Sequence, residues 1–172
     1  MRKKGTLYFF TGLSGAGKTT IGGLFYRHLK GKRNDIILLD GDQLRAAIGG
    51  DTRGKPDYST EARREGMWPT LKWCQLITDQ GIDIVYCTIA MYDVIREWNR
   101  AHIENYKEIY IKASMDTLFR RDQKQLYSSG AKNVVGIDLP YDEPKNPDFI
   151  VENDGQETPE EIVARLESYF GV

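Results

Sequence analysis

Cysteine and histidine are scarce in this chain, which has two of each in 172 residues. Cys74 lies in an apolar helical pattern and Cys87 in a strand-like run, and no metal-ligand spacing joins them to His28 or His102. Disulfide frameworks and Cys/His zinc sites need more ligands at closer spacing. We therefore expect two reduced, buried thiols, and we assign no metal-binding role to the histidines.

Long hydrophobic runs are also absent. No stretch approaches the roughly 18 apolar residues of a membrane span. The apolar run Leu7–Phe10 follows basic residues, as in a signal peptide, but Thr11-Gly12 ends it too early for that role. We expect a cytoplasmic protein with no membrane partner.

Neither sign of charge is in excess, because 24 basic residues stand against 25 acidic ones and the formal net charge is −1. The chain thus has no general attraction for nucleic acid, and any anion-binding site must be local. With 40% apolar residues, 28% charged residues and six prolines, the composition is typical of a soluble globular protein. The length fits one domain, which we place at residues 1–172.

Short apolar, β-branched or aromatic runs alternate with longer segments of helical period. This alternation predicts an α/β fold with an open parallel sheet of about five strands and helices on both faces. The predicted strands are Thr6–Thr11, Asp35–Leu39, Asp83–Thr88, Glu108–Lys112 and Phe149–Val151. The predicted helices are Lys18–Leu29, Asp42–Ile48, Thr60–Gln80, Tyr92–Asn105, Ser114–Arg121 and Pro159–Tyr169.

Two predicted helices carry local signals. Thr158 can cap the last helix, with Pro159 at its first position and Glu161 completing a capping box. Pro69 lies inside the third helix, where proline removes a backbone donor and crowds the preceding turn. There we expect a kink or a division into two shorter helices.

One stretch departs from the alternation. Residues 124–148 contain three prolines, two glycines and little periodicity. The stretch is too long for an ordinary connection in a compact domain, and such segments are typical of lids and binding loops. We expect a lid over about 124–148.

The sequence Gly12-Leu13-Ser14-Gly15-Ala16-Gly17-Lys18-Thr19 fits the phosphate-loop pattern G-x-x-x-x-G-K-[ST], between a predicted strand and a predicted helix. Glycines let such a loop fold around an anion and expose backbone N–H groups, and the helix adds the positive end of its dipole. Lys18 would contact the β- and γ-phosphates and contribute to catalysis, while the Thr19 hydroxyl is placed to bind Mg²⁺. The full motif disfavours the alternative of a glycine-rich turn with a solvated lysine. The predicted ATP-binding residues here are Gly12, Ser14, Gly15, Ala16, Gly17, Lys18, Thr19 and Thr20.

The predicted strand Asp35–Leu39 is followed by Asp40-Gly41-Asp42. Ligands bind beyond the carboxyl ends of strands in an open parallel sheet, so both carboxylates should lie beside the phosphate loop. There they could hold hydrated Mg²⁺ and accept a proton from an attacking hydroxyl. We predict that Asp40 and Asp42 are catalytic and that Asp40 joins Thr19 at the metal. The alternative is a turn in which Asp42 caps the next helix.

Four further stretches complete a pattern along the chain. They are Leu39–Arg45, Tyr58-Ser59 with Arg63, Arg121–Tyr127 and Gly136–Asp142. Together with the phosphate loop they resemble the adenylylsulfate (APS) kinase family, in order and over nearly the whole chain. The resemblance implies a P-loop kinase fold with a mobile lid, on which MgATP phosphorylates the 3′-hydroxyl of adenosine 5′-phosphosulfate. Members often form dimers, so it also implies a homodimer as one expected assembly.

The resemblance implies roles for individual residues. Asp40 and Asp42 would lie near the acceptor hydroxyl and Mg²⁺, and Arg45 and Arg63 would hold the acceptor's phosphosulfate. Tyr58 replaces a phenylalanine that stacks on the acceptor base. Arg121, Lys124 and Tyr127 would belong to the part of the lid that covers ATP. The residues that bind the acceptor would include Ile89, Val134, Ile137 and Asp138.

The acceptor-side motifs nevertheless diverge from the family. An asparagine and a pair of arginines of the family fall at Gly66, Trp68 and Pro69. The serine that can carry a phosphoryl group is Ala90 here, and the second base-stacking phenylalanine is Val134. The ATP-side motifs are retained. The resemblance thus supports a kinase of this fold more strongly than a kinase of APS.

Three hypotheses follow. The first is an APS kinase, which is the default. The second is a related enzyme for another activated nucleotide, such as a cytidine diphosphoramidate in capsular polysaccharide pathways. The third is a non-catalytic nucleotide sensor, which the acceptor-side set Asp40, Asp42, Arg45 and Arg63 disfavours because a sensor has no need of it. The chain lacks the N-K-x-D guanine motif of a GTPase switch.

Overall fold

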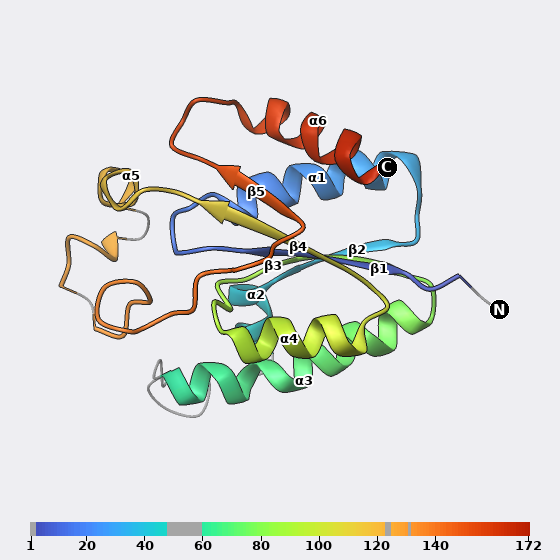
Figure 1. Ribbon diagram of the computed structural model, residues 1–172, viewed down its shortest axis with the longest axis horizontal. Helices are drawn as coiled ribbons and strands as arrows, with labels where there is room; N and C mark the ends of the chain where they lie inside the picture. Colours follow the sequence, from blue (N-terminus) through green and yellow to red (C-terminus); the bar gives the residue numbers. More distant parts are fainter. Residues whose placement is uncertain (1–2, 48–59, 123–124, 131) are drawn as a thin grey trace.

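A computed structural model describes residues 3–47, 60–122, 125–130 and 132–172 of the chain. Within these ranges five strands form a parallel sheet in the order β2-β3-β1-β4-β5 (Figure 1). The strands are β1 (Thr6–Thr11), β2 (Ile36–Asp40), β3 (Asp83–Cys87), β4 (Asn105–Lys112) and β5 (Phe149–Glu152). The predicted α/β fold with an open parallel sheet is confirmed.

Helices cover both faces of this sheet. In Figure 1, α1 and α6 lie above it, whereas α2, α3 and α4 lie below it. The helices are α1 (Lys18–Lys32), α2 (Gly41–Ala47), α3 (Thr60–Asp79), α4 (Asp93–His102), α5 (Met115–Arg121) and α6 (Pro159–Phe170). None of the helices among the described residues has the length and apolar character needed to cross a membrane.

The central strand β1 is apolar without interruption because both of its faces are buried. Tyr8 and Phe10 enter the core beneath α1, where both rings pack on Phe25 at centroid distances of 5.1 and 5.7 Å. Leu7 and Phe9 enter the opposite core. A parallel strand covered on both faces must be apolar at consecutive positions, because successive side chains point to opposite faces.

Most predicted element ends agree with the structure to within one or two residues. The capping box at Thr158 and Glu161 is present. The division of the third helix is wrong, since α3 continues through Pro69 as one helix. The predicted helix to Asn105 is also too long. It ends at His102 because Ile103 is extended and buried, and Asn105 already pairs with Thr6 at the start of β4.

The two cysteines are free and buried, as predicted. Cys74 lies on α3 in the core below the sheet, and Cys87 ends β3 beside the phosphate loop. Burial raises the pKa of each thiol to about 12. Both therefore remain protonated near neutral pH and act as small apolar side chains.

Candidate active site

The phosphate loop follows β1 and leads directly into α1. Gly12, Gly15 and Gly17 have positive φ angles of 150°, 79° and 107°. A Cβ atom on Gly12 would lie 2.2 Å from the Ile111 carbonyl oxygen, and one on Gly17 would lie 2.5 Å from the side-chain nitrogen of Asn153. Both the backbone conformation and the close approach thus require glycine, as the motif predicted.

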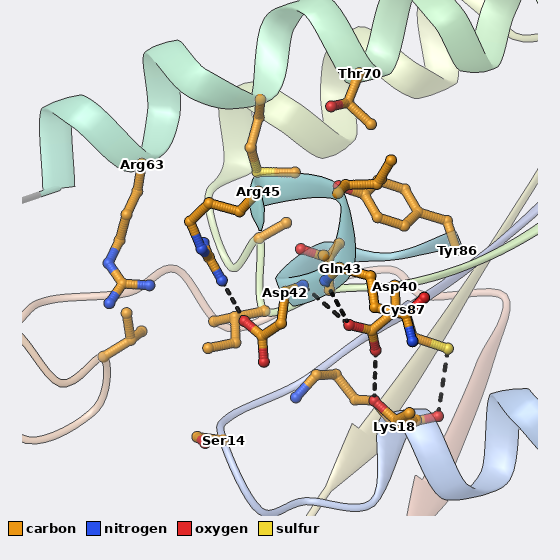
Figure 2. A pocket seen from close by; sticks show the side chains of 18 of the residues that line it. Ser14, Lys18, Asp40, Asp42, Gln43, Arg45, Arg63, Thr70, Tyr86 and Cys87 are labelled. Carbon is orange, nitrogen blue, oxygen red and sulfur yellow. Dashed lines mark hydrogen bonds and ion pairs between the residues drawn. The ribbon is translucent and has the colours of Figure 1, made fainter. Parts of the chain in front are cut away.

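Lys18 is the first residue of α1 and is largely buried, with 9% of its surface exposed. Its Nζ atom donates a hydrogen bond of 2.8 Å to the Leu13 carbonyl oxygen, which holds the ammonium group over the loop. The Lys18 side chain projects into the cleft between the loop and α2 (Figure 2). An ammonium group at this place can contact phosphates bound by the loop.

Thr19 and Asp40 meet beside the loop. The Thr19 hydroxyl donates to Asp40 Oδ2 at 2.9 Å, while Asp40 Oδ1 accepts from the backbone N–H groups of Asp42 and Gln43 at 3.0 and 3.2 Å. Asp40, and not Asp42 as the alternative interpretation had it, thus caps the start of α2. The hydroxyl and the carboxylate are hard oxygen ligands of the kind that Mg²⁺ prefers, and such sites take their remaining ligands from phosphates and water. The pair therefore fits Mg²⁺.

Asp42 is the second residue of α2 and lines the cleft. It forms an ion pair with Arg45 on the same helix. Figure 2 shows its carboxylate pointing toward the Lys18 ammonium group. The carboxylate thus stands between the phosphate-binding loop and the side of the cleft where an acceptor would enter, which suits a general base.

A cleft of about 520 Å³ extends from the phosphate loop between α2, α3 and the end of β3. Arg63 on α3 forms one side of it, and its Nη2 atom donates to the Asn133 carbonyl oxygen at 3.1 Å. Arg45 lies between Arg63 and Asp42 in Figure 2. Predicted residues on its lining are Ser14, Gly15, Gly17, Lys18, Thr19, Thr20, Asp40, Asp42, Arg45, Arg63 and Ile89.

The last residue of α5 and the chain that follows it contact the phosphate loop. Arg121 donates to the carbonyl oxygens of Gly15 and Ala16 at 3.2 and 3.4 Å. The Tyr127 hydroxyl donates to the Ser14 carbonyl oxygen at 2.7 Å. Both side chains thus lie against the phosphate loop, and their roles at ATP stay predictions. Lys124 and Tyr58, which the sequence placed at the ATP and acceptor sites, lie outside the described residues.

Asn153, which sequence reasoning missed, also holds the loop. Its Nδ2 atom donates to the Ala16 carbonyl oxygen at 2.7 Å, and its own carbonyl accepts from Arg121 at 2.9 Å. The residue directly follows β5, at the same sheet edge as the phosphate loop. A polar residue just beyond a strand end was the signal that could have found it.

The acceptor side of the lid is arranged around Asp138. This carboxylate accepts from the backbone N–H groups of Asn133 and Val134 at 2.6 and 2.5 Å, and these bonds lower the pKa of Asp138. Val134 is 5% exposed and Ile137 is 47% exposed, and neither lines the cleft. Val135 lines it instead. In this structure Asp138 orders the turn, and roles for Val134, Ile137 and Asp138 in acceptor binding stay predictions.

Ala90 lies where β3 leads into α4, on the cleft lining. It is 4% exposed and has a φ of 31°, a conformation that L-residues rarely adopt. Its methyl group offers no oxygen for a phosphoryl group. The cleft therefore has no hydroxyl nucleophile at this position.

The sheet order, the glycine loop before α1 and the Lys18, Thr19 and Asp40 cluster define the chain as a P-loop kinase. The model of the adenylylsulphate kinase family matches residues 4–152. The chain therefore belongs to the adenylylsulphate kinase family and is an APS-kinase-like, ATP-binding phosphotransferase.

Two curated relatives of equal identity carry different names. The chain is 36% identical over 167 residues to the cytidine diphosphoramidate kinase of Campylobacter jejuni, which covers 95% of both chains. It is 36% identical over 166 residues to the adenylyl-sulfate kinase of a Picosynechococcus species, covering 94% of this chain and 92% of the relative. Sequence identity alone therefore does not choose between the two acceptors.

Solved structures share the fold. The APS kinase of Mycobacterium tuberculosis in complex with AMPPNP and APS superimposes with a TM-score of 0.86 at 26% identity, over 98% of this chain and 99% of that one. A structure of APE1195 gives a TM-score of 0.85 at 29% identity, over 99% and 97% of the chains. The predicted P-loop kinase fold and the family resemblance are confirmed.

Proposed function

We propose that this chain transfers the γ-phosphoryl group of ATP to the ribose 3′-hydroxyl of a nucleotide, and that the acceptor is a cytidine 5′-diphosphoramidate. One observation carries the proposal. The acceptor cleft opens directly onto the phosphate loop, with the carboxylate of Asp42 and the guanidinium groups of Arg45 and Arg63 on its lining. A site that only sensed ATP would have no need of this second charged set.

Each charged residue of the cleft has its own role in the proposed reaction. The acceptor hydroxyl oxygen attacks the γ-phosphorus, its proton passes to the Asp42 carboxylate, and the bond from the γ-phosphorus to the bridging oxygen breaks so that ADP leaves. Lys18 stabilises the charge that develops on the phosphoryl oxygens. Thr19 and Asp40 would hold Mg²⁺, which neutralises phosphate charge when bound. Arg45 and Arg63 orient the acceptor through its 5′ phosphates.

The choice of acceptor rests on what the family's acceptor side has lost. Gly66, Trp68 and Pro69 occupy the positions where the family has an asparagine and two arginines. Val134 occupies the position where the family has a second base-stacking ring. Each stacked base is worth about 1–3 kcal/mol. Without the second ring the preference for a large purine weakens. A cytidine diphosphoramidate kinase is among the relatives, at the same 36% identity as an adenylyl-sulfate kinase, so this acceptor is as compatible with the sequence similarity as APS is.

The test compares acceptors that differ only in their base. Without the second ring a purine should lose the roughly 5-fold advantage that about 1 kcal/mol of stacking gives, so cytidine 5′-diphosphoramidate should have a kcat/KM equal to or above that of adenosine 5′-diphosphoramidate. APS should be weaker than the cytidine compound. A clear preference for APS over both compounds would contradict the proposed acceptor and support an APS kinase. A rate of ATP turnover that no acceptor changes would support a sensor.

We also propose that the lid is shorter than the sequence suggested and comprises the described residues between 125 and 141. Beyond it, the Asp142 backbone N–H donates to the Met91 carbonyl oxygen at 2.9 Å, and Arg96 donates to the Asp142 carbonyl oxygen at 2.8 Å. Arg100 likewise donates to the Asn146 carbonyl oxygen at 3.0 Å. These hydrogen bonds hold residues 142–148 against α4. The part of the lid that can close over the nucleotides is therefore the segment before residue 142.

Trypsin tests this division, because Lys132 lies inside the proposed lid and the exposed Lys145 lies beyond it. In the free protein we expect cleavage after Lys132 before cleavage after Lys145. An ATP analogue with acceptor should suppress the first cut, since a closed lid excludes solvent and protease alike. Cleavage after Lys132 at the same rate with and without ligands would contradict a closing lid.

A further inference from the structure

The cleft has a neutral end. Thr70 on α3 and Tyr86 on β3 both line it, and each is only 3% exposed. In Figure 2 they lie on one side of α2, while Arg63 lies on the other. The Thr70 side chain makes no hydrogen bond with any residue that the structure describes. A hydroxyl that lines a cleft and has no partner among the described residues is available to a ligand.

The charged side chains of the cleft lie toward its other parts, and of these Arg45 and Asp40 are near enough to act on Tyr86 electrostatically. Among the described lining residues the cations are Lys18, Arg45 and Arg63. Uncharged lining residues pack in the core cluster of Tyr86 or lie one helical turn from Thr70, and Thr88 is hydrogen-bonded to Tyr86; the others are Leu44, Gly66, Met67 and Ala90. Burial raises the pKa of Tyr86, so its hydroxyl stays protonated. This hydroxyl shares a hydrogen bond with the Thr88 side chain and has a further lone pair that can accept from a ligand.

We infer that this neutral end is a subsite for the terminal group of the acceptor's 5′ tail, and that Thr70 and Tyr86 select a terminal group that donates hydrogen bonds, such as an amino group on phosphorus. The inference rests on the proposed function. The inner phosphate of the tail would lie at Arg45 and Arg63, and the tail would continue past Gly66 into the subsite.

Hydrogen-bonding capacity explains the selection. A terminal sulfate or phosphate presents only acceptor oxygens and negative charge, and its burial away from a cation is costly. Two hydroxyl groups can donate hydrogen bonds to only some of the oxygen lone pairs of a sulfate or phosphate. An amino group on phosphorus instead donates to the lone pairs of Thr70 and Tyr86, while the charged oxygen of the same phosphorus can turn back toward the arginines.

The test uses two pairs of acceptors in which the base is constant within each pair. The first pair is cytidine 5′-diphosphoramidate and CDP, and the second is adenosine 5′-diphosphoramidate and APS. The parent protein should prefer the amino-terminated member of each pair in kcat/KM. Thr70→Val and Tyr86→Phe each remove one hydroxyl and keep most of the side-chain volume. Each should lower kcat/KM for the amino-terminated acceptor roughly 3- to 10-fold, as expected for one hydrogen bond, and leave the KM for ATP unchanged.

Thr78→Val is the matched control. Thr78 lies on the same helix and is 2% exposed, but its hydroxyl bonds to the Cys74 carbonyl oxygen and it does not line the cleft. The control should keep the parent's preference within each pair. Melting temperatures of all three variants separate loss of folding from loss of selection, and Tyr86→Phe remains decisive should Thr70→Val fold poorly.

The outcomes separate this inference from the proposed function. Equal losses for both members of a pair, or selection as strong as in the parent, would overturn the inference and leave the proposed function intact. A shift in base preference at constant tail would place the base in this subsite and overturn it as well. If no acceptor of either pair is phosphorylated, the proposed function fails and the inference fails with it.

Discussion

Lys18→Ala is expected to lower kcat for phosphoryl transfer about 10²–10³-fold, as the loss of one preorganised donor does at comparable sites. Lys18 projects from the start of α1 into the cleft, and its ammonium group lies 2.8 Å from the Leu13 carbonyl oxygen. The charge on the phosphoryl oxygens shifts during transfer, and alanine offers nothing to stabilise it. Steady-state kinetics with saturating ATP and acceptor measure the effect.

Lys30→Ala is the control for this change. Lys30 lies at the far end of the same helix, where its Nζ atom bonds to the Asn34 carbonyl oxygen at 2.9 Å. Its loss should leave kcat within about 2-fold of the parent, as for most surface substitutions. Both variants should keep the circular dichroism of the parent. Activity of Lys18→Ala within a few-fold of the parent would remove Lys18 from the mechanism.

Asp42→Asn is expected to lower kcat about 10²–10⁴-fold, the usual contribution of a general base. An amide cannot accept the proton of the attacking hydroxyl, yet it has nearly the same shape as the carboxylate. Because Asp40 caps α2 and bonds to Thr19, Asp42→Asn should leave both features intact. Kinetics give kcat, and calorimetric titration with ADP should show little change in affinity.

Asp116→Asn supplies the matched control, since Asp116 is an exposed carboxylate on α5 outside the cleft. It should behave as the parent does. The acid limb of the pH profile of kcat should disappear in Asp42→Asn and persist in the control, because protonation of the base causes that limb. A full rate with an unchanged pH profile in Asp42→Asn would show that Asp42 is not the base.

The phosphate loop and the sheet could be predicted because their signals are local. The positive φ angles at Gly12 and Gly17 and the position of Lys18 follow from a contiguous motif between a strand and a helix. The uninterrupted apolar run of β1 reflects burial on both faces. In each case the residues that carry the structure are neighbours in the sequence.

The remaining details depend on residues that are distant in the sequence. Asn153 contacts the Ala16 carbonyl oxygen across 137 positions; its place just beyond β5 marks a polar residue at the sheet edge but does not reveal its partner. Asp40 rather than Asp42 caps α2, because β2 ends one residue later than predicted. Val135 rather than Val134 entered the cleft lining because the turn ordered by Asp138 sets which side chain points inward.

The most direct test of the account is to identify the product. The protein is incubated with ATP, Mg²⁺ and cytidine 5′-diphosphoramidate, and the nucleotide product is analysed by phosphorus NMR with coupling to the ribose protons. The account predicts a new phosphomonoester coupled to the proton on C3′, formed in equal amount to ADP and absent when the acceptor is omitted. Formation of ADP without a phosphorylated acceptor, or a phosphate at any other position of the nucleotide, would contradict it.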